Sequence, residues 1–322
     1  MVKLLHRTTM GSLIAGLRDR IRPPGRMSHR PRGRIPKLDA VPIANAEQFE
    51  RYLGDFRDEF SSRHDRMARM NRPVDRVETD GFCVCCGRES RFWTPGSGAN
   101  HGASTIPVPN WREGLICPGC GLNSRMRSAV HFILGQPTIN RRSRIYLTEQ
   151  TTPLFRMIKR LYPQTVGSEY LRDGTPRGQV NARELRHEDL TRLTFADSSF
   201  EGLVCLEVLE HVPDFRRALA ECVRVLAPGG WMLLGVPFHR GPRHLERARI
   251  DSQGRVEHLL PPEYHGDPLD PEGCLCFHHF GWDLLEFLRE AGFREAIGYS
   301  IWSPELGYMA SEGDIHLFSA RK

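Results

Sequence analysis

Residues 200–236 read FEGLVCLEVLEHVPDFRRALAECVRVLAPGGWMLLGV, and this stretch decides the fold. The apolar run Leu203–Leu206 predicts a buried strand. A helix follows, because Asp214 is a natural N-cap and one apolar stripe comes after it, formed by Phe215, Leu219, Cys222, Val223 and Leu226. Pro228-Gly-Gly ends this helix and turns the chain into a second strand, Trp231–Val236.

The same alternation of short apolar runs and helical segments extends over 144–322. The further expected strands are Ile145–Thr148, Thr165–Gly167, Ile297–Ile301 and Ile315–Ser319, and the further expected helices begin at Pro153 and Trp282. Alternation of this kind predicts an α/β fold with a mostly parallel sheet covered on both faces. In such sheets ligands bind at the carboxyl ends of the strands.

Three motifs carry a resemblance to a known family. They read HEDLTRLTFADSSF at 187–200, LEVLEHVPD at 206–214 and RVLAPGG at 224–230. At this spacing they resemble the type 11 class I methyltransferases, densely over 187–238 and more weakly over 137–322. The resemblance implies a Rossmann-like, seven-stranded, mostly parallel sheet with helices on both faces. It also implies an S-adenosylmethionine-dependent methyltransferase, EC 2.1.1.-.

Carried over by position, the resemblance implies a set of cofactor-binding residues. Asp189 would accept a hydrogen bond from the adenine amino group, with Leu190 supplying the adjacent backbone contact. Glu169 would bind the ribose hydroxyls. Carboxylates suit both tasks because the amino and hydroxyl partners present hydrogen-bond donors. The further residues expected to contact the cofactor are Tyr170, Leu206 and Glu207.

The loop after the first expected strand departs from the family. Members usually have an acid followed by a G-x-G-type loop, whereas Glu149 is followed here by Gln150, Thr151, Thr152 and Pro153, with no glycine. Thr152 is a good N-cap and Pro153 a good first helical residue, so a helix N-terminus still points to the expected place of the methionine carboxylate. We expect a divergent loop that contacts the cofactor, with loss of cofactor binding as the alternative.

His211 is the candidate catalytic residue, because it follows the strand Leu203–Leu206. Methyl transfer needs a general base only if the acceptor is a hydroxyl or a protonated amine. In this family the Leu-Glu-His segment more often shapes the cofactor pocket, so that role stays open as well.

The long segment 239–280 contains six histidines and is expected to form the substrate wall. This segment also contains a group of residue types that commonly bind metals, namely Cys274, Cys276, His278 and His279. On an extended strand only alternate residues share a face, however, and the sequence defines no fourth ligand. Packing and substrate polarity explain these residues more simply.

Two cysteine units precede the α/β segment: Cys83-Val-Cys-Cys86-Gly and Cys117-Pro-Gly-Cys120-Gly. Two thiolates three residues apart on a tight turn can share one tetrahedral Zn²⁺, and the following glycine supplies the positive φ of the turn. Four cysteines close the coordination shell, so we predict a structural zinc. The intervening residues, which include His101, exceed the usual spacing of a zinc ribbon. Cys85 is surplus and could replace a neighbour as ligand.

A helix is expected over 123–134, ending at a Gly135 cap, and a polar helix is expected from Asn45. An apolar stripe marks the polar helix, formed by Phe49, Leu53, Phe56 and Phe60.

The charge of the chain is uneven. Residues 1–37 hold ten Lys and Arg against one acid, whereas the net charge of all 322 residues is only +6. Residues 1–22 can form a basic amphipathic helix and 23–36 a linker. The tail indicates contact with a nucleic acid or, peripherally, with an anionic membrane surface, or else a solvated disordered segment.

The cysteines and the hydropathy bear on location. Nine cysteines, five of them between 83 and 120, fit a reducing compartment and a metal better than disulfides. No secretory signal peptide is recognisable, and no apolar run reaches the roughly 18 residues of a transmembrane segment. The expected location is therefore cytoplasmic.

Three parts are expected: a basic, partly disordered extension with a polar helix (1–75), a zinc-knuckle module with a connecting helix (76–136) and the methyltransferase domain (137–322). The leading hypothesis is a methyltransferase acting on a small molecule or glycan precursor. An RNA methyltransferase that binds nucleic acid through the zinc module and basic tail comes second. The third is a non-catalytic, zinc-stabilised binding protein on a degenerate methyltransferase fold.

Overall fold

The structure is a computed structural model that describes residues 36–70, 76–95, 109–311 and 313–322. The expected basic helix 1–22, almost all of the linker 23–36, and His101 lie outside these residues. No helix within the described residues is both long enough and apolar enough to span a bilayer.

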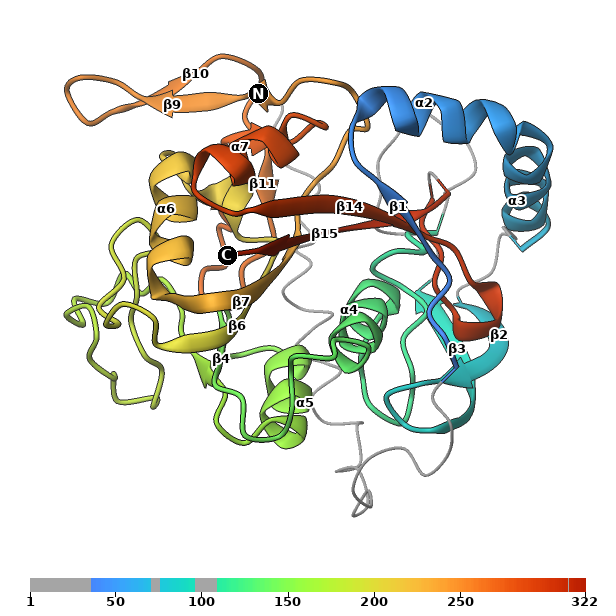
Figure 1. Cartoon of the computed structure of the whole chain (residues 1–322), viewed down its shortest axis with the longest axis horizontal. Helices are drawn as coiled ribbons and strands as arrows, with labels where there is room; N and C mark the ends of the chain where they lie inside the picture. The colour runs from blue at the N-terminus through green and yellow to red at the C-terminus, as the bar shows by residue number, and fades with distance from the viewer. Residues whose placement is uncertain (1–35, 71–75, 96–108, 312) are drawn as a thin grey trace, which may run out of the picture.

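A seven-stranded sheet forms the centre of the molecule, with the strand order β1-β14-β15-β7-β6-β4-β5 (Figure 1). The strands are β1 (Ala40–Ile43), β4 (Ile145–Leu147), β5 (Val166–Gly167), β6 (Phe200–Leu206), β7 (Leu226–Gly235), β14 (Glu295–Ile301) and β15 (Ile315–Arg321). β5, β4, β6 and β7 pair in parallel, whereas β15, β14 and β1 join by antiparallel pairing. Because β14 thereby runs in the direction of β7, most strands share one direction. The predicted Rossmann-like, mostly parallel fold is confirmed.

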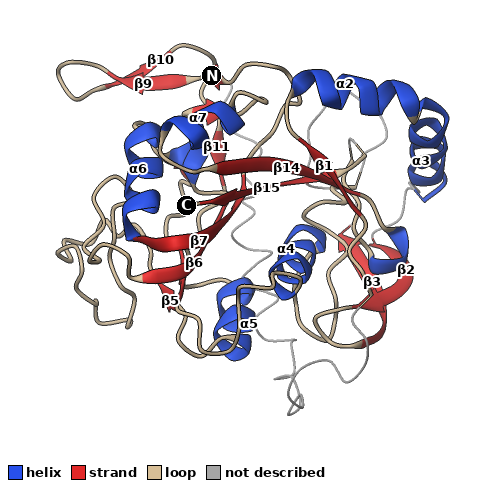
Figure 2. Ribbon diagram, viewed as in Figure 1, coloured by secondary structure: helices blue, strands red, loops and turns tan. Residues whose placement is uncertain are grey.

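Helices cover both faces of the sheet (Figure 2). α4 (Ser124–Leu134) and α5 (Pro153–Leu161) pack on one face, and α6 (Phe215–Val225) and α7 (Leu284–Glu290) on the other. Side chains alternate between the faces of a strand. In β6, Val204 and Leu206 accordingly join the cluster of α4 and α5, whereas Leu203 and Cys205 join that of α6 and α7.

The helix ends largely follow the predicted caps. Thr152 accepts a hydrogen bond from the Phe155 amide at the start of α5, and Asp214 accepts one from the Arg217 amide at the start of α6. Gly135 ends α4 as expected, but its φ of −80° is right-handed, so this cap does not use the freedom of glycine. α7 begins at Leu284, two residues after the expected Trp282.

The strand β1 is the main feature that the sequence did not reveal. It adds to the edge of the sheet by antiparallel pairing with β14, from Ala40 opposite Ile301 to Ile43 opposite Gly298. At the other edge, beyond β5, the described chain makes only an isolated parallel bridge between Glu169 and His187. The seventh strand is therefore supplied by the N-terminal segment.

Two helices follow β1, namely α2 (Ala46–Asp55) and α3 (Arg57–Met70). Asn45 caps α2 as predicted, and Phe49 is buried in the cluster of α6 and α7. The helix breaks at Phe56, whose side chain is 46% exposed. The expected apolar stripe thus holds only in part.

The cysteine-rich segment is built on a hairpin of β2 (Arg76–Cys83) and β3 (Arg88–Pro95), with Cys83 at the end of β2 and Cys86 in the turn. Its apolar side chains share one hydrophobic cluster with the main sheet, in which Phe92 and Trp111 pack with Tyr308 and Leu317. The division of the chain into three parts stays a prediction.

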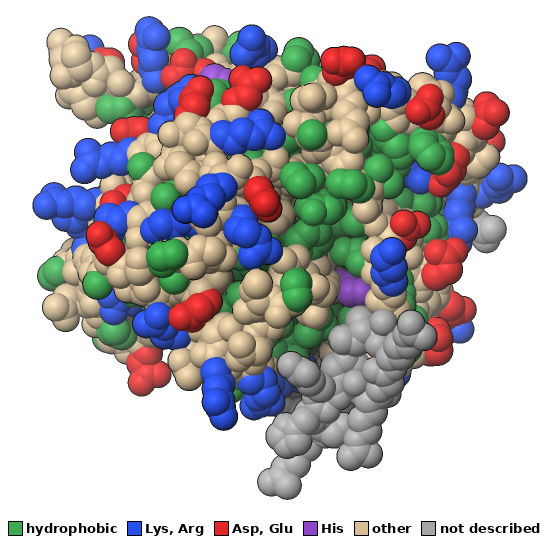
Figure 3. Space-filling view, in the orientation of Figure 1, with side chains coloured by type: hydrophobic (Ala, Val, Ile, Leu, Met, Phe, Trp, Pro, Cys, Tyr) green, Lys and Arg blue, Asp and Glu red, His purple; other side chains and the backbone are tan. Residues whose placement is uncertain are grey.

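The strands of segment 239–280 are short. They are β8 (Leu245–Glu246), β9 (Ala248–Ile250), β10 (Val256–His258), β11 (Tyr264–His265), β12 (Cys274–Leu275) and β13 (His278–His279). β9 pairs with β10 and β11 with β12 as hairpins, whereas β8 pairs with the distant β13. The remaining short elements are the 3-10 helices η1 (Leu209–His211) and η2 (Pro304–Leu306). On the face of the molecule in Figure 3, Lys and Arg side chains are scattered with Asp and Glu between them.

Candidate cofactor and metal sites

The carboxyl ends of three parallel strands meet at one edge of the sheet, which is where ligands bind in open α/β folds. β4 leads into Thr148 and Glu149, β5 into Ser168 and Glu169, and β6 into Glu207. Three of the predicted cofactor-binding acids therefore share this edge. Glu207 has a positive φ of 56°, a backbone conformation that is uncommon for a residue with a side chain.

The loop without glycine is held in place by Glu169. Its Oε1 accepts hydrogen bonds from the amides of Gln150, at 2.7 Å, and Thr151, at 2.8 Å, and from the Thr151 hydroxyl at 2.9 Å. The Gln150 side chain in turn accepts from the Arg186 amide at 2.9 Å and donates to the Glu184 carbonyl at 2.8 Å. The structure thus brings three predicted residues into direct contact. Oε1 accepts all three of these bonds.

Glu149 is a half-buried acid, and one of its carboxylate oxygens lacks a hydrogen-bond partner among the described residues. This oxygen, Oε1, is also inaccessible to solvent. Burial raises the pKa of Glu149 to about 7, with Glu169 and Glu207 adding to the shift and Arg125 opposing it. A cationic ligand next to this carboxyl group would satisfy the oxygen and favour its ionised form.

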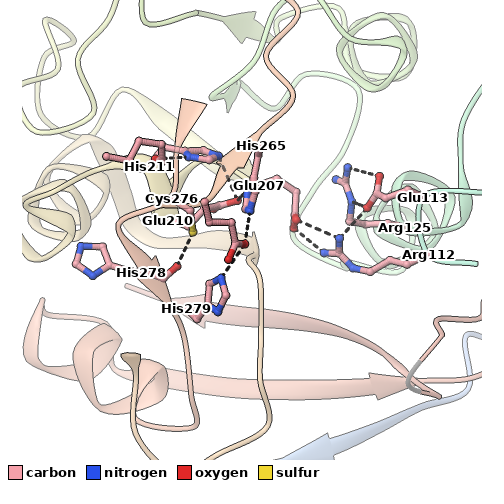
Figure 4. Close-up of polar contacts among 12 residues, drawn as sticks. Arg112, Glu113, Arg125, Glu207, Glu210, His211, His265, Cys276, His278 and His279 are labelled. Carbon is pink, nitrogen blue, oxygen red and sulfur yellow. Dashed lines mark hydrogen bonds and ion pairs between the residues drawn. The ribbon is translucent and has the colours of Figure 1, made fainter. Parts of the chain in front are cut away.

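Glu207 is paired with Arg112, which belongs with Glu113 and Arg125 to one charged network (Figure 4). Arg112 donates to both carboxylate oxygens, at 2.6 and 3.0 Å, and also contacts Glu113, which Arg125 binds through two nitrogens at 2.7 and 3.0 Å. Burial acts to raise the pKa of Glu207, but the charges of Arg112 and Arg125 outweigh it and lower the pKa. The same arginines hold the pKa of Glu113 at about 2 despite burial. This network joins the end of β6 to the cysteine-rich segment.

The other predicted cofactor residues lie along the same side of the sheet. Asp189 Oδ1 accepts from the amide and hydroxyl of Thr191, at 2.9 and 2.7 Å, and so closes its own turn. Leu190 and Leu206 are buried, whereas Tyr170 is 61% exposed. An exposed aromatic ring beside Glu169 offers a surface on which a planar group can stack.

His211 ends the 3-10 helix η1 that follows β6. Its Nδ1 lies 2.8 Å from the Leu275 carbonyl oxygen, and because a carbonyl only accepts, Nδ1 carries the proton. In the neutral ring Nε2 is then the proton acceptor, and it lies 3.6 Å from Glu210 Oε1. This tautomer is the one that a general base acting through Nε2 requires.

The four predicted zinc ligands converge. Cys83 Sγ lies 3.8 Å from Cys120 Sγ, and Cys86 Sγ lies 3.7 Å from Cys117 Sγ. A tetrahedral zinc with bonds of about 2.3 Å separates its sulfur ligands by about 3.8 Å. The residues present therefore fit a zinc ion. The surplus Cys85 is buried but does not belong to this group of four.

The glycines of the two knuckles have the predicted backbone conformation. Gly87 and Gly121 have φ values of 67° and 73°. A Cβ at Gly119 would approach Arg88 Nη2 to 2.9 Å and Cys86 Sγ to 3.0 Å, so a larger residue there would crowd the cysteine group.

Two groups of polar residues at this site had no signal in the sequence. Arg112 pairs with Glu207 across 95 residues of sequence, and Arg125 reaches this network through Glu113; no local pattern marks such pairing. Glu263 and His265 lie with Cys276 and His279 in a group that could hold a metal. Cys274 and His278, which lie close to Cys276 and His279 in the sequence, stay outside this group.

Comparison with known proteins agrees with the motifs. Residues 152–234 match the family described as Methyltransferase domain. Ubiquinone biosynthesis O-methyltransferase of Alkalilimnicola ehrlichii is 33% identical over 85 residues, which are 26% of this chain and 34% of that protein. O-methyltransferase cnsE of Penicillium expansum is 32% identical over 121 residues, 37% of this chain and 36% of that protein.

The chain thus spans about a third of the length of these curated relatives. The crystal structure of an S-adenosylmethionine-dependent methyltransferase from Mesorhizobium loti aligns with 62% of this chain and 96% of that one, at 18% identity and a TM-score of 0.38. The matched part of the sequence is similar to class I S-adenosylmethionine-dependent methyltransferases.

Proposed function

We propose that this chain is an S-adenosylmethionine-dependent methyltransferase with its cofactor at the carboxyl ends of β4, β5 and β6. The observation that carries the proposal is the pairing of Glu169 with the Gln150–Thr151 loop, beside the buried, unpartnered Glu149 oxygen. The match of residues 152–234 to the methyltransferase family supports it.

Each residue has a distinct part in this proposal. Glu169 Oε2 accepts from the ribose hydroxyls, and Asp189 and Leu190 bind the adenine. Glu149 offers its unpartnered oxygen to the cationic methionine end, while the α5 N-terminus behind Thr152 faces the carboxylate. The cofactor supplies an electrophilic methyl group on a sulfonium. The protein positions the acceptor in line with that group and excludes water.

The proposed acceptor is a hydroxyl or amine on a small molecule or glycan precursor. His211 would accept its proton through Nε2, because Nδ1 is committed to Leu275. The segment 239–280 adjoins this histidine through Leu275 and would form the substrate wall. The curated relatives with O-methyltransferase names support an oxygen acceptor.

The four cysteines Cys83, Cys86, Cys117 and Cys120 would hold a structural zinc. It would fix the turn of the β2–β3 hairpin against the segment that carries Arg112 and Arg125. Because four thiolates complete its coordination shell, we assign this zinc no step in the reaction.

Calorimetry with S-adenosylmethionine and S-adenosylhomocysteine tests the proposal. Wild type should bind both, and Glu169→Ala should bind at least about tenfold more weakly, since hydrogen bonds to a charged group contribute about 1.5–3 kcal/mol. Glu50→Ala is the matched control, because Glu50 is an exposed acid on α2. If wild type binds neither compound, the proposed function is wrong.

An RNA substrate is distinguished by salt dependence. Residues 1–37 carry ten basic side chains. RNA binding through them would weaken steeply as salt rises and would disappear when they are removed. That result would favour the RNA methyltransferase over the small-molecule enzyme.

A further inference from the structure

A hairpin in the segment 239–280 gathers ligand-type side chains beside the end of β6. β11 pairs with β12, so that His265 lies opposite Cys274, and the Cys276 amide donates to the Glu263 carbonyl at 2.8 Å. Alternation along a strand puts Glu263 and His265 on the same face. His279 reaches the same place from β13.

The four side chains converge at coordination distances. Glu263 Oε1 lies 3.0 Å from His265 Nε2 and 3.0 Å from His279 Nε2. These atoms and Cys276 Sγ all lie within 4.8 Å of one another. In a tetrahedral zinc site with bonds of about 2.0–2.3 Å, the ligand atoms are about 3.3–3.8 Å apart. Figure 4 shows Cys276, His265 and His279 on one side of Glu207 and the arginines on the other.

We propose that Glu263, His265, Cys276 and His279 bind a Zn²⁺ ion, in a second metal site separate from the four cysteines. A thiolate, two imidazoles and a carboxylate are all ligands that zinc takes. Mg²⁺ and Ca²⁺ prefer oxygen ligands throughout, so this donor set selects against them. The proposal does not rest on the proposed methyltransferase activity.

Two neighbouring residues, Arg247 and Glu210, contact the proposed ligands and would orient them toward the metal. Glu263 Oε2 pairs with Arg247 at 3.1 Å, which leaves Oε1 directed at the histidines. His265 Nδ1 lies 3.7 Å from Glu210 Oε1. Metal-bound histidines commonly direct their second ring nitrogen at a carboxylate, which fixes the tautomer.

The proposal also accounts for Glu210. This residue is fully buried, and neither carboxylate oxygen has a hydrogen-bond partner among the described residues. A buried carboxylate without a hydrogen bond is costly. Facing a zinc-bound imidazole, Glu210 would accept the proton that His265 carries on Nδ1. The zinc would thereby tie the hairpin to η1, the element that contains His211.

A second arrangement uses Glu210, His211 and His265 as ligands. It contains three ligands rather than four and no thiolate. In this arrangement His265 would have to bind the metal through Nδ1. His265 Nδ1 lies 3.7 Å from Glu210 Oε1, whereas His265 Nε2 lies only 3.0 Å from Glu263 Oε1. The site around Cys276 is therefore favoured, and variants distinguish the two.

Metal analysis of the full-length protein, after dialysis against trace zinc, tests the site. Wild type should contain two zinc ions per chain and Cys276→Ala one, while both retain the same circular dichroism spectrum. Cys274→Ala is the matched control, because Cys274 belongs to the same hairpin but not to the group of four, and it should keep two. Two zinc ions in Cys276→Ala, or one in wild type, would overturn the proposal.

Cobalt substitution gives a readout specific to sulfur ligation. With four thiolates in one site and one in the other, Cys276→Ala should lower the thiolate-to-cobalt absorption by about a fifth, and Cys274→Ala should not change it.

The Glu210→Gln variant distinguishes the two arrangements. It should still bind the second zinc, about 10–100-fold more weakly, because Glu210 contacts a ligand and is not itself a ligand. If Glu210→Gln lost this zinc completely while Cys276→Ala kept it, the ion would be bound by Glu210, His211 and His265. The proposed site around Cys276 would then be wrong.

Discussion

Glu149, at the end of β4, has a carboxyl group whose protonation should depend on folding. Its pKa of about 7 lies above the ordinary value of 4.5, chiefly because of burial. Between pH 4.5 and 7, Glu149 is therefore protonated in the folded protein but ionised in the unfolded chain. The resulting stabilisation is complete below pH 4.5 and is lost as the pH rises through 7.

Glu149→Gln should remove this pH dependence. Between pH 4.5 and 8 the free energy of unfolding of wild type should fall by up to about 3 kcal/mol more than that of the variant, as the pKa shift implies. Urea unfolding at several pH values, without cofactor, measures the difference. Parallel pH profiles for the two proteins would show that Glu149 ionises as an ordinary surface acid does.

At the scale of elements, β1 gives the segment before residue 75 a part in the main fold. Ile43 is 1% exposed and packs in the cluster of α6 and α7. Ile43→Ala should lower the free energy of unfolding by about 2–4 kcal/mol, because it leaves a cavity in that core.

Denaturant unfolding of Ile43→Ala beside Asp39→Ala, an exposed residue just before β1, measures the effect. Asp39→Ala should change the free energy of unfolding by less than about 0.5 kcal/mol. Equal, small effects of both substitutions would mean that β1 does not belong to the cooperative core.

Local patterns predicted the elements well, because a helix cap or an apolar strand is encoded within a few residues. Thr152 and Asp214 are examples, whereas the expected turn Pro228-Gly-Gly lies within β7, which already begins at Leu226. The sequence did not predict β1, because this strand is four residues long and contains a proline. It is stabilised by pairing with β14, more than 250 residues away. Such non-local pairing leaves no periodic signal.

The candidate site likewise has residues that the sequence indicated and residues that only the structure brought together. The resemblance placed Glu169 and Asp189, and their cofactor-binding roles stay predictions, whereas the two compact C-x2-C units predicted four cysteines that the structure brings together. Glu263 and His265 could not be joined to Cys276 and His279 before the hairpin was known, since spacing alone does not give strand register.

For the whole molecule, the cysteine-rich segment and the sheet work as a unit. They share a hydrophobic cluster, and Arg112 and Arg125 surround Glu207 at the sheet edge. The combined variant Cys83→Ser and Cys86→Ser should therefore lose one zinc and also bind S-adenosylhomocysteine at least about tenfold more weakly, because loss of the zinc frees these arginines from their positions.

Metal analysis and calorimetry on the same preparation check both outcomes. Cys85→Ser is the control, because Cys85 lies between the two ligands but outside the group of four. Cofactor affinity unchanged by the loss of zinc would show that the cysteine-rich segment does not support the sheet edge.

We propose that the carboxyl edge of β4, β5 and β6 binds the cofactor. A crystal structure of the full chain with S-adenosylhomocysteine tests it most directly. We expect the ribose at Glu169, the adenine at Asp189 and the methionine end beside Glu149 and the start of α5. A structure with this edge empty at saturating ligand, or with the ligand bound elsewhere, would contradict the account.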